Sequence, residues 1–294
     1  MITTEIYPET RSPAVAGYFY PLDPDELRRA IEASFQHPIG PGKLPTISPT
    51  RARGSTGFVV PHAGYIYSGP VAAHSYYKLA EEGMPETFII IGPNHTGYGA
   101  LVSVYPSGKW STPLGEIEVD AELARSIVNN SEYAELDVYA HTEEHSIEVQ
   151  LPFLQYLFGN KFKIVPIVLA LQTPEVAEDL AKAIYDAIAH NGRDIVILAS
   201  SDFTHYEPYE SARSKDLKAI EKILELDTHG FYNIIKELNV SVCGPGGIMV
   251  LMEYTRKVYG GNAGAELLKY ATSGDTSGDK SAVVGYASIR FYGK

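Results

Sequence analysis

Short, continuously apolar runs alternate along the chain with longer stretches in which apolar residues recur at helical spacing. The short runs predict buried strands over residues 58–60, 88–91, 164–169 and 195–198. The longer stretches predict helices over residues 71–82, 121–128, 147–158, 174–190 and 248–258. Alternating strands and helices favour a mostly parallel sheet that helices cover on both faces. The pattern therefore predicts a three-layer α/β/α fold.

Segments near the two ends of the chain depart from this alternation. Asp23 and Pro24 predict the start of a helix, because aspartate caps helices and proline suits their first position. Residues 37–56 are rich in proline and glycine and predict a loop. Added strands, antiparallel to the rest, are predicted over residues 101–105, 117–119, 266–271 and 282–291. Turn-forming residues at 273–279 would join the last two as a hairpin.

The composition is that of an ordinary folded protein. The chain has 294 residues, of which 45% are apolar and 20% charged, and these values argue against extensive disorder. Because this length is near the upper limit for one hydrophobic core and no internal repeat is visible, we predict a single α/β domain over residues 1–294. A formal charge of −12 without a basic cluster argues against nucleic acid and anionic lipid as partners.

Cysteine usage and apolar run length bear on location. Cys243 is the only cysteine, so no intramolecular disulfide is possible. The longest mostly apolar run, residues 164–171, is far shorter than the roughly 20 residues that a membrane-spanning helix needs. We therefore expect a cytoplasmic protein that is not a membrane partner.

Polar side chains gather just after three of the predicted strands. His62 follows the first strand and His95 follows the second. Ser200, Asp202 and His205 follow the strand predicted over residues 195–198. Ligands of open α/β sheets bind outside the carboxyl ends of the strands, where such loops converge. These residues are therefore candidates for a common site.

Cys243 stands immediately before a predicted helix. Pro245 suits the first helical position, which places Cys243 at or just before the cap, where free N–H groups favour a thiolate. A thiolate together with imidazoles is a plausible transition-metal site. Taken singly, each histidine also fits a hydrogen-bonding or capping role, and a lone cysteine is also often a small buried apolar residue.

A second polar concentration spans residues 141–148. If Thr142 caps a helix, His145 and Glu148 lie three positions apart on one face, where they would jointly contact a metal or each other at the edge of the site. The alternative is a charged first helical turn that interacts favourably with the helix dipole.

Six short segments resemble, in order, those of the MEMO family, named for a mediator of ErbB2-driven cell motility. They read RSPAVAG at residues 11–17, PHAGY at 61–65, GPNH at 92–95, EHSIE at 144–148, SSDFTHY at 200–206 and VCG at 242–244. The resemblance covers nearly the whole chain. It implies a fold like that of the class III extradiol dioxygenases, which are non-haem iron enzymes.

The resemblance also implies a metal site and a cofactor. His62, His95 and Cys243 would be the metal ligands, with Asp202 and His205 beside them in the same cleft as catalytic residues. Iron or copper is the implied metal, and zinc is possible because a thiolate replaces the carboxylate of the dioxygenases. We therefore hypothesise a metal-binding protein with an oxidoreductase-like site. Because Asp202 and His205 share the same strand end, Asp202 would orient or charge His205 for proton transfer.

Two other functions are compatible with the same residues. One is a module that binds a metal or a peptide without turnover. The other is a metal-free hydrolase, in which Cys243 is the nucleophile, His205 or His62 the base and Asp202 the orienting group. The ligand is accordingly expected to be a small molecule or a peptide, and neither its identity nor the oligomeric state follows from the sequence.

Overall fold

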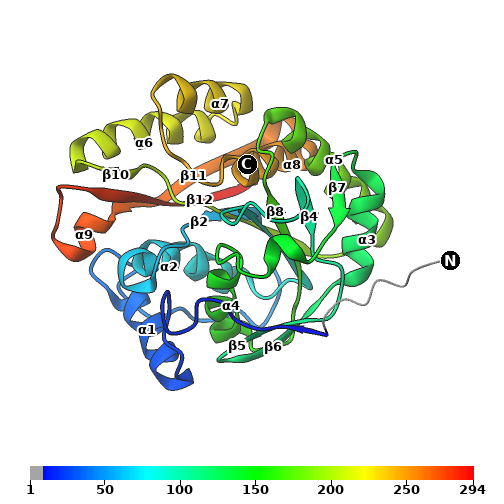
Figure 1. Cartoon of the computed structure of the whole chain (residues 1–294), viewed down its shortest axis with the longest axis horizontal. Coiled ribbons are helices and arrows are strands. Elements are labelled where there is room, and N and C mark those ends of the chain that lie inside the picture. The colour runs from blue at the N-terminus through cyan, green and yellow to red at the C-terminus, as the bar shows by residue number, and fades with distance from the viewer. Residues whose placement is uncertain (1–8) are drawn as a thin grey trace.

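The computed structural model describes residues 9–294, which form a mixed sheet between layers of helices (Figure 1). Along the main path of the sheet the strands are β1 (Thr10–Arg11), β5 (Lys109–Thr112), β6 (Gly115–Val119), β8 (Lys163–Leu169), β3 (Thr87–Pro93), β9 (Ile195–Ser200), β2 (Ser55–Val60), β12 (Val283–Gly293) and β10 (His205–Glu207). Off this path, β11 (Ala263–Thr272) pairs with β12, and β4 (Val102–Val104) pairs with β8 and β7 (Ala134–Leu136).

The centre of the sheet is parallel. Strands β8, β3, β9 and β2 run side by side in the same direction, and their carboxyl ends share one edge. At one edge the added strands are antiparallel, since β12 pairs antiparallel to β2 and β11 antiparallel to β12. At the other edge β4 pairs antiparallel to β8, but β6, which covers the strand predicted over residues 117–119, runs parallel to β8. The predicted three-layer α/β fold with a mostly parallel sheet and added antiparallel strands is therefore confirmed.

Helices cover both faces of the sheet. They are α1 (Pro24–Gln36), α2 (Tyr65–Glu82), α3 (Ala121–Asn130), α4 (Leu151–Phe158), α5 (Pro174–Asn191), α6 (Tyr209–Leu224), α7 (Thr228–Glu237), α8 (Pro245–Tyr259) and α9 (Ser273–Ser277). One face packs against α1, α2 and α4, and the other against α3, α5 and α8 (Figure 1). On β3, Phe88 and Ile90 enter the first core, whereas Ile89 and Ile91 enter the second. Burial on both faces explains why the central strands are continuously apolar.

The predicted starts of two helices and the predicted hairpin agree with the structure to different extents. Asp23 caps α1 as predicted, because its side chain accepts hydrogen bonds from two backbone N–H groups of the first turn. Helix α2 begins at Tyr65, ahead of the predicted residue 71, and continues through Pro70, which is buried in the core layer. The hairpin of β11 and β12 is present, but its connection contains the short helix α9, which a capping box at Thr272 begins.

Two expectations about helices were wrong or incomplete. Thr142 does not cap a helix; it ends the short 3-10 turn Tyr139–His141, and the chain bends before a second one, Glu148–Gln150, leads into α4. Helices α6 and α7 were not predicted. The buried face of α6 contains two alanines and an aspartate beside two isoleucines, which weakens its apolar period.

Within residues 9–294, no helix is both long enough and apolar enough to cross a membrane.

Candidate metal centre

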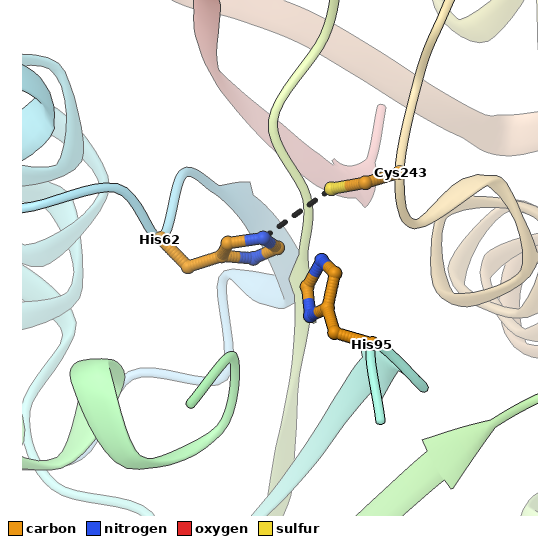
Figure 2. A group of neighbouring side chains, drawn as sticks. All are labelled: His62, His95 and Cys243. Atoms are coloured by element: carbon orange, nitrogen blue, oxygen red, sulfur yellow. Dashed lines mark hydrogen bonds between the residues drawn. The ribbon is translucent and has the colours of Figure 1, made fainter. Parts of the chain in front are cut away.

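The three predicted ligands meet at the carboxyl edge of the parallel strands. His62 follows β2, His95 follows β3, and Cys243 precedes Gly244, which caps α8. Figure 2 shows the two rings and the sulfur directed toward one another. One ligand atom from each of the three residues lies within 4.8 Å of the others. The Sγ atom of Cys243 is 3.3 Å from Nε2 of His62. Segments far apart in the sequence therefore converge on one small volume.

The first imidazole is buried and firmly held. His62 is only 2% exposed. Its backbone N–H donates to Oδ1 of Asp202 at 2.8 Å, and its Nδ1 lies 2.9 Å from Oγ of Ser200. Burial, followed by the charges of His145 and His95, holds the pKa of His62 well below its usual value. The ring is therefore neutral at pH 7, the state in which an imidazole binds a metal.

The second imidazole is fixed by a carboxylate that the sequence analysis did not single out. Glu144 is fully buried and accepts hydrogen bonds from the backbone N–H of His95 at 2.6 Å and from Nδ1 of the same ring at 2.8 Å. It also accepts one from the backbone N–H of Ser146. Burial alone would raise the pKa of Glu144, but these bonds and the charge of His95 lower it to about 2. With Nδ1 bonded to Glu144, Nε2 is the atom of His95 that remains for a ligand. Burial lowers the pKa of His95, but the hydrogen bond and charge of Glu144 outweigh it and raise that pKa, so an ion at Nε2 would have to displace a proton.

The hydrogen-bonding partner that a metal-binding imidazole needs is the signal that points to Glu144. Histidine ligands usually donate their other ring nitrogen to a carboxylate or carbonyl group. Glu144 directly precedes His145 in the EHSIE segment. The sequence did not reveal that this segment returns to the loop of His95, 49 positions away.

Cys243 is held by the loop after β9. Its sulfur accepts a hydrogen bond from the backbone N–H of Asp202 at 3.2 Å. Desolvation, and then the charge of Asp202, raises the pKa of the thiol. The expectation that the start of α8 favours a thiolate is therefore wrong for the protein without a metal ion. In addition, the N–H groups of Gly244 and Gly246 donate to Ser201 and Gln172, so neither of them donates to the sulfur.

His145 adds a third imidazole to the cleft. Its ring stacks on that of His95 with centroids 4.5 Å apart and packs against His62 at 5.3 Å. Phe19 covers it at 4.5 Å. Burial lowers the pKa of His145 to about 4. One ligand atom each of His95, Glu144 and His145 also lies within 4.8 Å of the others, but Glu144 is already occupied by hydrogen bonds.

Glu148 does not lie in the cleft with His145. Its carboxylate pairs with Nη1 of Arg11 at 2.6 Å and accepts a hydrogen bond from the Tyr20 hydroxyl at 2.7 Å. The backbone N–H groups of Ala14 and Val15 also donate to it. The predicted joint contact of His145 and Glu148 is absent from the described residues, because Glu148 pairs with Arg11 whereas His145 packs against His95 and His62.

Asp202 and His205 line the same cavity but are not hydrogen-bonded to each other within the described residues. Nδ1 of His205 lies 2.8 Å from the carbonyl oxygen of Ser241. Asp202 instead accepts from the backbone N–H of His62, and burial raises the pKa of Asp202 to about 6. Asp202 therefore positions the loop of a candidate ligand, and Ser241 orients His205.

Two of the candidate ligands, His62 and His95, line a cavity of about 690 Å³. Four aromatic side chains line it, Phe19, Tyr67, Tyr206 and Tyr286. Polar residues of the connection between β11 and β12 complete the wall, Ser273, Ser277 and Asp279. A volume of this size accommodates a small organic molecule beside the histidines.

The donor set is chemically suited to a transition metal. Two imidazole nitrogens and one sulfur are ligands for copper, zinc and iron, and hard cations such as Mg²⁺ prefer oxygen. Both imidazoles already have a hydrogen-bonding partner on Nδ1. The residues present therefore fit the metal that the resemblance implies.

Comparisons with known proteins agree with this architecture. A family model described as "Memo-like protein" matches residues 11–290. A MEMO1 family protein of Desulfurococcus amylolyticus is 61% identical over 282 residues, which cover 96% of this chain and 99% of the relative. A MEMO1 family protein of Ignicoccus hospitalis is 57% identical over 281 residues, which cover 96% and 98%.

Among solved structures, an uncharacterized protein of Escherichia coli K12 is similar with a TM-score of 0.50 at 13% identity. The match covers 79% of this chain and 98% of that one. At this identity the likeness concerns the fold alone. The family match over nearly the full length and the high identity of the relatives have one consequence: this chain belongs to the Memo-like protein family.

Proposed function

We propose that this protein binds iron or copper through Nε2 of His62, Nε2 of His95 and Sγ of Cys243, and acts as an oxidoreductase on a small molecule. The convergence of these three ligand atoms within 4.8 Å, with His62 and His95 lining a cavity, is the observation that supports the proposal. A bound iron or copper ion would supply electron-transfer and oxygen chemistry. Three protein ligands leave coordination positions open for a substrate.

The residues around the cavity would handle protons and bind the substrate. His205 is oriented by Ser241 through Nδ1, which leaves Nε2 available to a molecule in the cavity. Asp202 borders the same space and holds the His62 loop. The aromatic side chains of Phe19, Tyr67 and Tyr206 offer flat apolar surface to a small ring or chain.

Metal analysis tests this proposal directly. Protein purified without a tag and without oxygen is expected to contain about one iron or copper ion per chain by elemental analysis. The variants His62→Ala and Cys243→Ser should lose the ion while their circular dichroism stays unchanged. His74→Ala is the matched control, because His74 lies in α2 and contacts the Ile39 carbonyl group instead of the cleft. Wild-type protein that takes up neither metal would refute the proposal.

Turnover separates an enzyme from a module that only holds the metal. Oxygen consumption by the loaded protein with catechols or other reductants, and water exchange at the metal in magnetic resonance spectra, are expected for an enzyme. A saturated ion without exchangeable water would favour the non-catalytic module.

A metal-free hydrolase is the second candidate, because Sγ of Cys243 lies 3.3 Å from Nε2 of His62. The pKa directions speak against it: the thiol pKa is raised and the imidazole pKa is lowered, so the neutral pair is favoured over thiolate and imidazolium. Rapid iodoacetamide labelling of the metal-free protein at pH 6 would support the hydrolase.

A further inference from the structure

A buried network beneath His62 fixes which nitrogen of that ring carries the proton. It consists of Tyr76, Gln150, Ser200 and the carbonyl group of Ser146. None of these residues is more than 1% exposed. Because the network lies away from water, every donor in it must find a protein acceptor. The positions of its hydrogens can therefore be worked out one after another.

The amide of Gln150 comes first. One end faces the carbonyl oxygen of Pro61 at 3.0 Å, and a carbonyl group only accepts, so this end must be the NH₂ group. The other end accepts the hydroxyl of Tyr76. The second hydrogen of the NH₂ group then points to Oγ of Ser200 at 2.9 Å.

The hydroxyl of Ser200 comes next. Its Oγ lies 2.7 Å from the carbonyl oxygen of Ser146, which again only accepts, so the single hydroxyl hydrogen goes there. One lone pair of Oγ receives the hydrogen from Gln150. The other lone pair faces Nδ1 of His62 at 2.9 Å. Since Ser200 has no hydrogen left to give, Nδ1 must be the donor.

From this chain of hydrogen bonds we infer that Ser200 is a positioning residue that locks His62 as the Nδ1–H tautomer and so keeps Nε2 ready for the metal. The inference rests on the proposed metal site. Gln150 and the Ser146 carbonyl group act through Ser200. Because they engage its hydroxyl hydrogen and one lone pair, Ser200 can only accept a hydrogen bond from His62. Nε2 then carries a lone pair directed toward Cys243, whose sulfur lies 3.3 Å away. Nε2 of His62 is therefore unprotonated in the metal-free protein.

The same stretch of chain serves both imidazoles. Glu144 accepts from Nδ1 of His95, and Ser146 and Gln150 set the hydroxyl that accepts from Nδ1 of His62. Residues 144–150 therefore link two loops that follow different strands. Both rings present the same nitrogen to the cleft, as preorganised metal ligands require.

Nitrogen-15 NMR of the metal-free protein tests the tautomer without any metal. In protein carrying ¹⁵N-histidine, the ring resonances of His62 are assigned by their loss in His62→Gln. We expect a protonated Nδ1 and an unprotonated Nε2 in the wild type. In Ser200→Ala the acceptor is gone, and we expect Nε2 to become the protonated nitrogen in most molecules. Ser75→Ala is the control, because Ser75 is equally buried but bonds to Val59 and Ser288 instead of to an imidazole.

Titration with Co²⁺ alone then measures the consequence for the metal. Followed by the sulfur-to-cobalt absorption band, Ser200→Ala should bind about 10–100-fold more weakly than the wild type and Ser75→Ala equally well. An unprotonated Nδ1 in the wild type, or an unchanged tautomer in folded Ser200→Ala, would overturn the inference. If Ser200→Ala does not fold, the tautomer of the wild type is compared with that of Ser200→Cys. The cysteine sulfur is a weaker hydrogen-bond acceptor, so the Nδ1–H tautomer should be less populated in that variant. Wild-type protein with the expected tautomer that binds no metal would refute the proposed function and not the lock.

Discussion

Two buried clusters share the segment from His141 to Glu148 but differ in what faces them. Toward the cleft, Glu144 bonds to His95, whose ring borders an open cavity. Toward the N-terminal segment, Glu148 pairs with Arg11, whose Nε also donates to the carbonyl oxygen of His141. Two fully buried carboxylates four positions apart therefore have different partners, an imidazole in one case and a guanidinium in the other.

The difference separates stability from metal binding. A guanidinium is always charged, so a buried carboxylate beside it is needed to neutralise it and bears mainly on folding. An imidazole beside a carboxylate keeps one nitrogen free, so that carboxylate bears mainly on what the ring can bind. Substitutions on the Arg11 side should therefore change the free energy of unfolding, and those on the cleft side should change metal affinity.

The largest effect is expected from Glu148→Ala. The substitution leaves the charge of Arg11 buried without its partner and removes the acceptor of the Tyr20 hydroxyl. Breaking a buried ion pair in this way costs about 3–5 kcal/mol in the free energy of unfolding, measured by urea denaturation at pH 7. Glu116→Ala is the control, because its solvent-exposed pair with Lys109 should contribute little to stability. Equal losses in the two variants would contradict the comparison.

His141 should make stability depend on pH. Burial, and then the charge of Arg11, lowers the pKa of His141 from 6.5 to about 3. Between these pH values His141 is therefore protonated in the unfolded chain but not in the folded protein. The contribution of His141 to the free energy of unfolding falls as the pH drops below 6.5. The slope is up to about 1.4 kcal/mol per pH unit.

Replacement of His141 tests that slope. In His141→Gln, whose amide can still donate to the Ser103 carbonyl group, this contribution to the slope should vanish. Urea denaturation of both proteins between pH 4 and 7 measures the difference. Parallel stability curves for the two proteins would show that His141 is protonated as easily in the folded state as in the unfolded chain.

Glu144→Gln should act on the metal instead. The amide can replace the carboxylate in size but not in charge, so the hydrogen bond to Nδ1 of His95 weakens. We expect a loss of about 10–100-fold in Co²⁺ affinity, measured by competition with a chelator. Under conditions where it is folded, Glu148→Gln should bind Co²⁺ like the wild type. A larger loss of affinity in Glu148→Gln than in Glu144→Gln would reverse the assignment of the two carboxylates.

Much of the fold and part of the site could be predicted because they depend on local pattern. The central strands are buried on both faces and so are apolar without interruption, which made them visible. Parallel strands share one carboxyl edge, which brought His62 and His95 into one prediction; Cys243 was added from its place before a predicted helix, and the family resemblance implied the three as ligands. The structure places these three residues together, and their role as ligands stays a proposal.

The partners of these residues could not be predicted, because they depend on where a distant segment returns. Glu144 and Glu148 look alike in sequence, as acidic residues of one charged turn. In the structure Glu144 bonds to His95, whereas Glu148 pairs with Arg11. Ser200 was placed near the site by its position at the end of β9, but Gln150, which directly precedes α4, carries no local sign that it bonds to Ser200.

The smallest effect is expected from His205→Ala, which tests how far the candidate metal centre extends across the cavity. His205 is partly exposed, and its ring bonds to the Ser241 carbonyl group instead of to any candidate ligand. Its loss should cost about 0.5–1 kcal/mol of stability, as for one hydrogen bond near solvent, and should leave Co²⁺ affinity within about twofold of the wild type because a ligand bond is not removed. Thermal unfolding and Co²⁺ titration measure the two quantities. A tenfold fall in affinity would make His205 part of the ligand set, and the proton-transfer role proposed for it would then have to pass to another group that borders the cavity, such as His145.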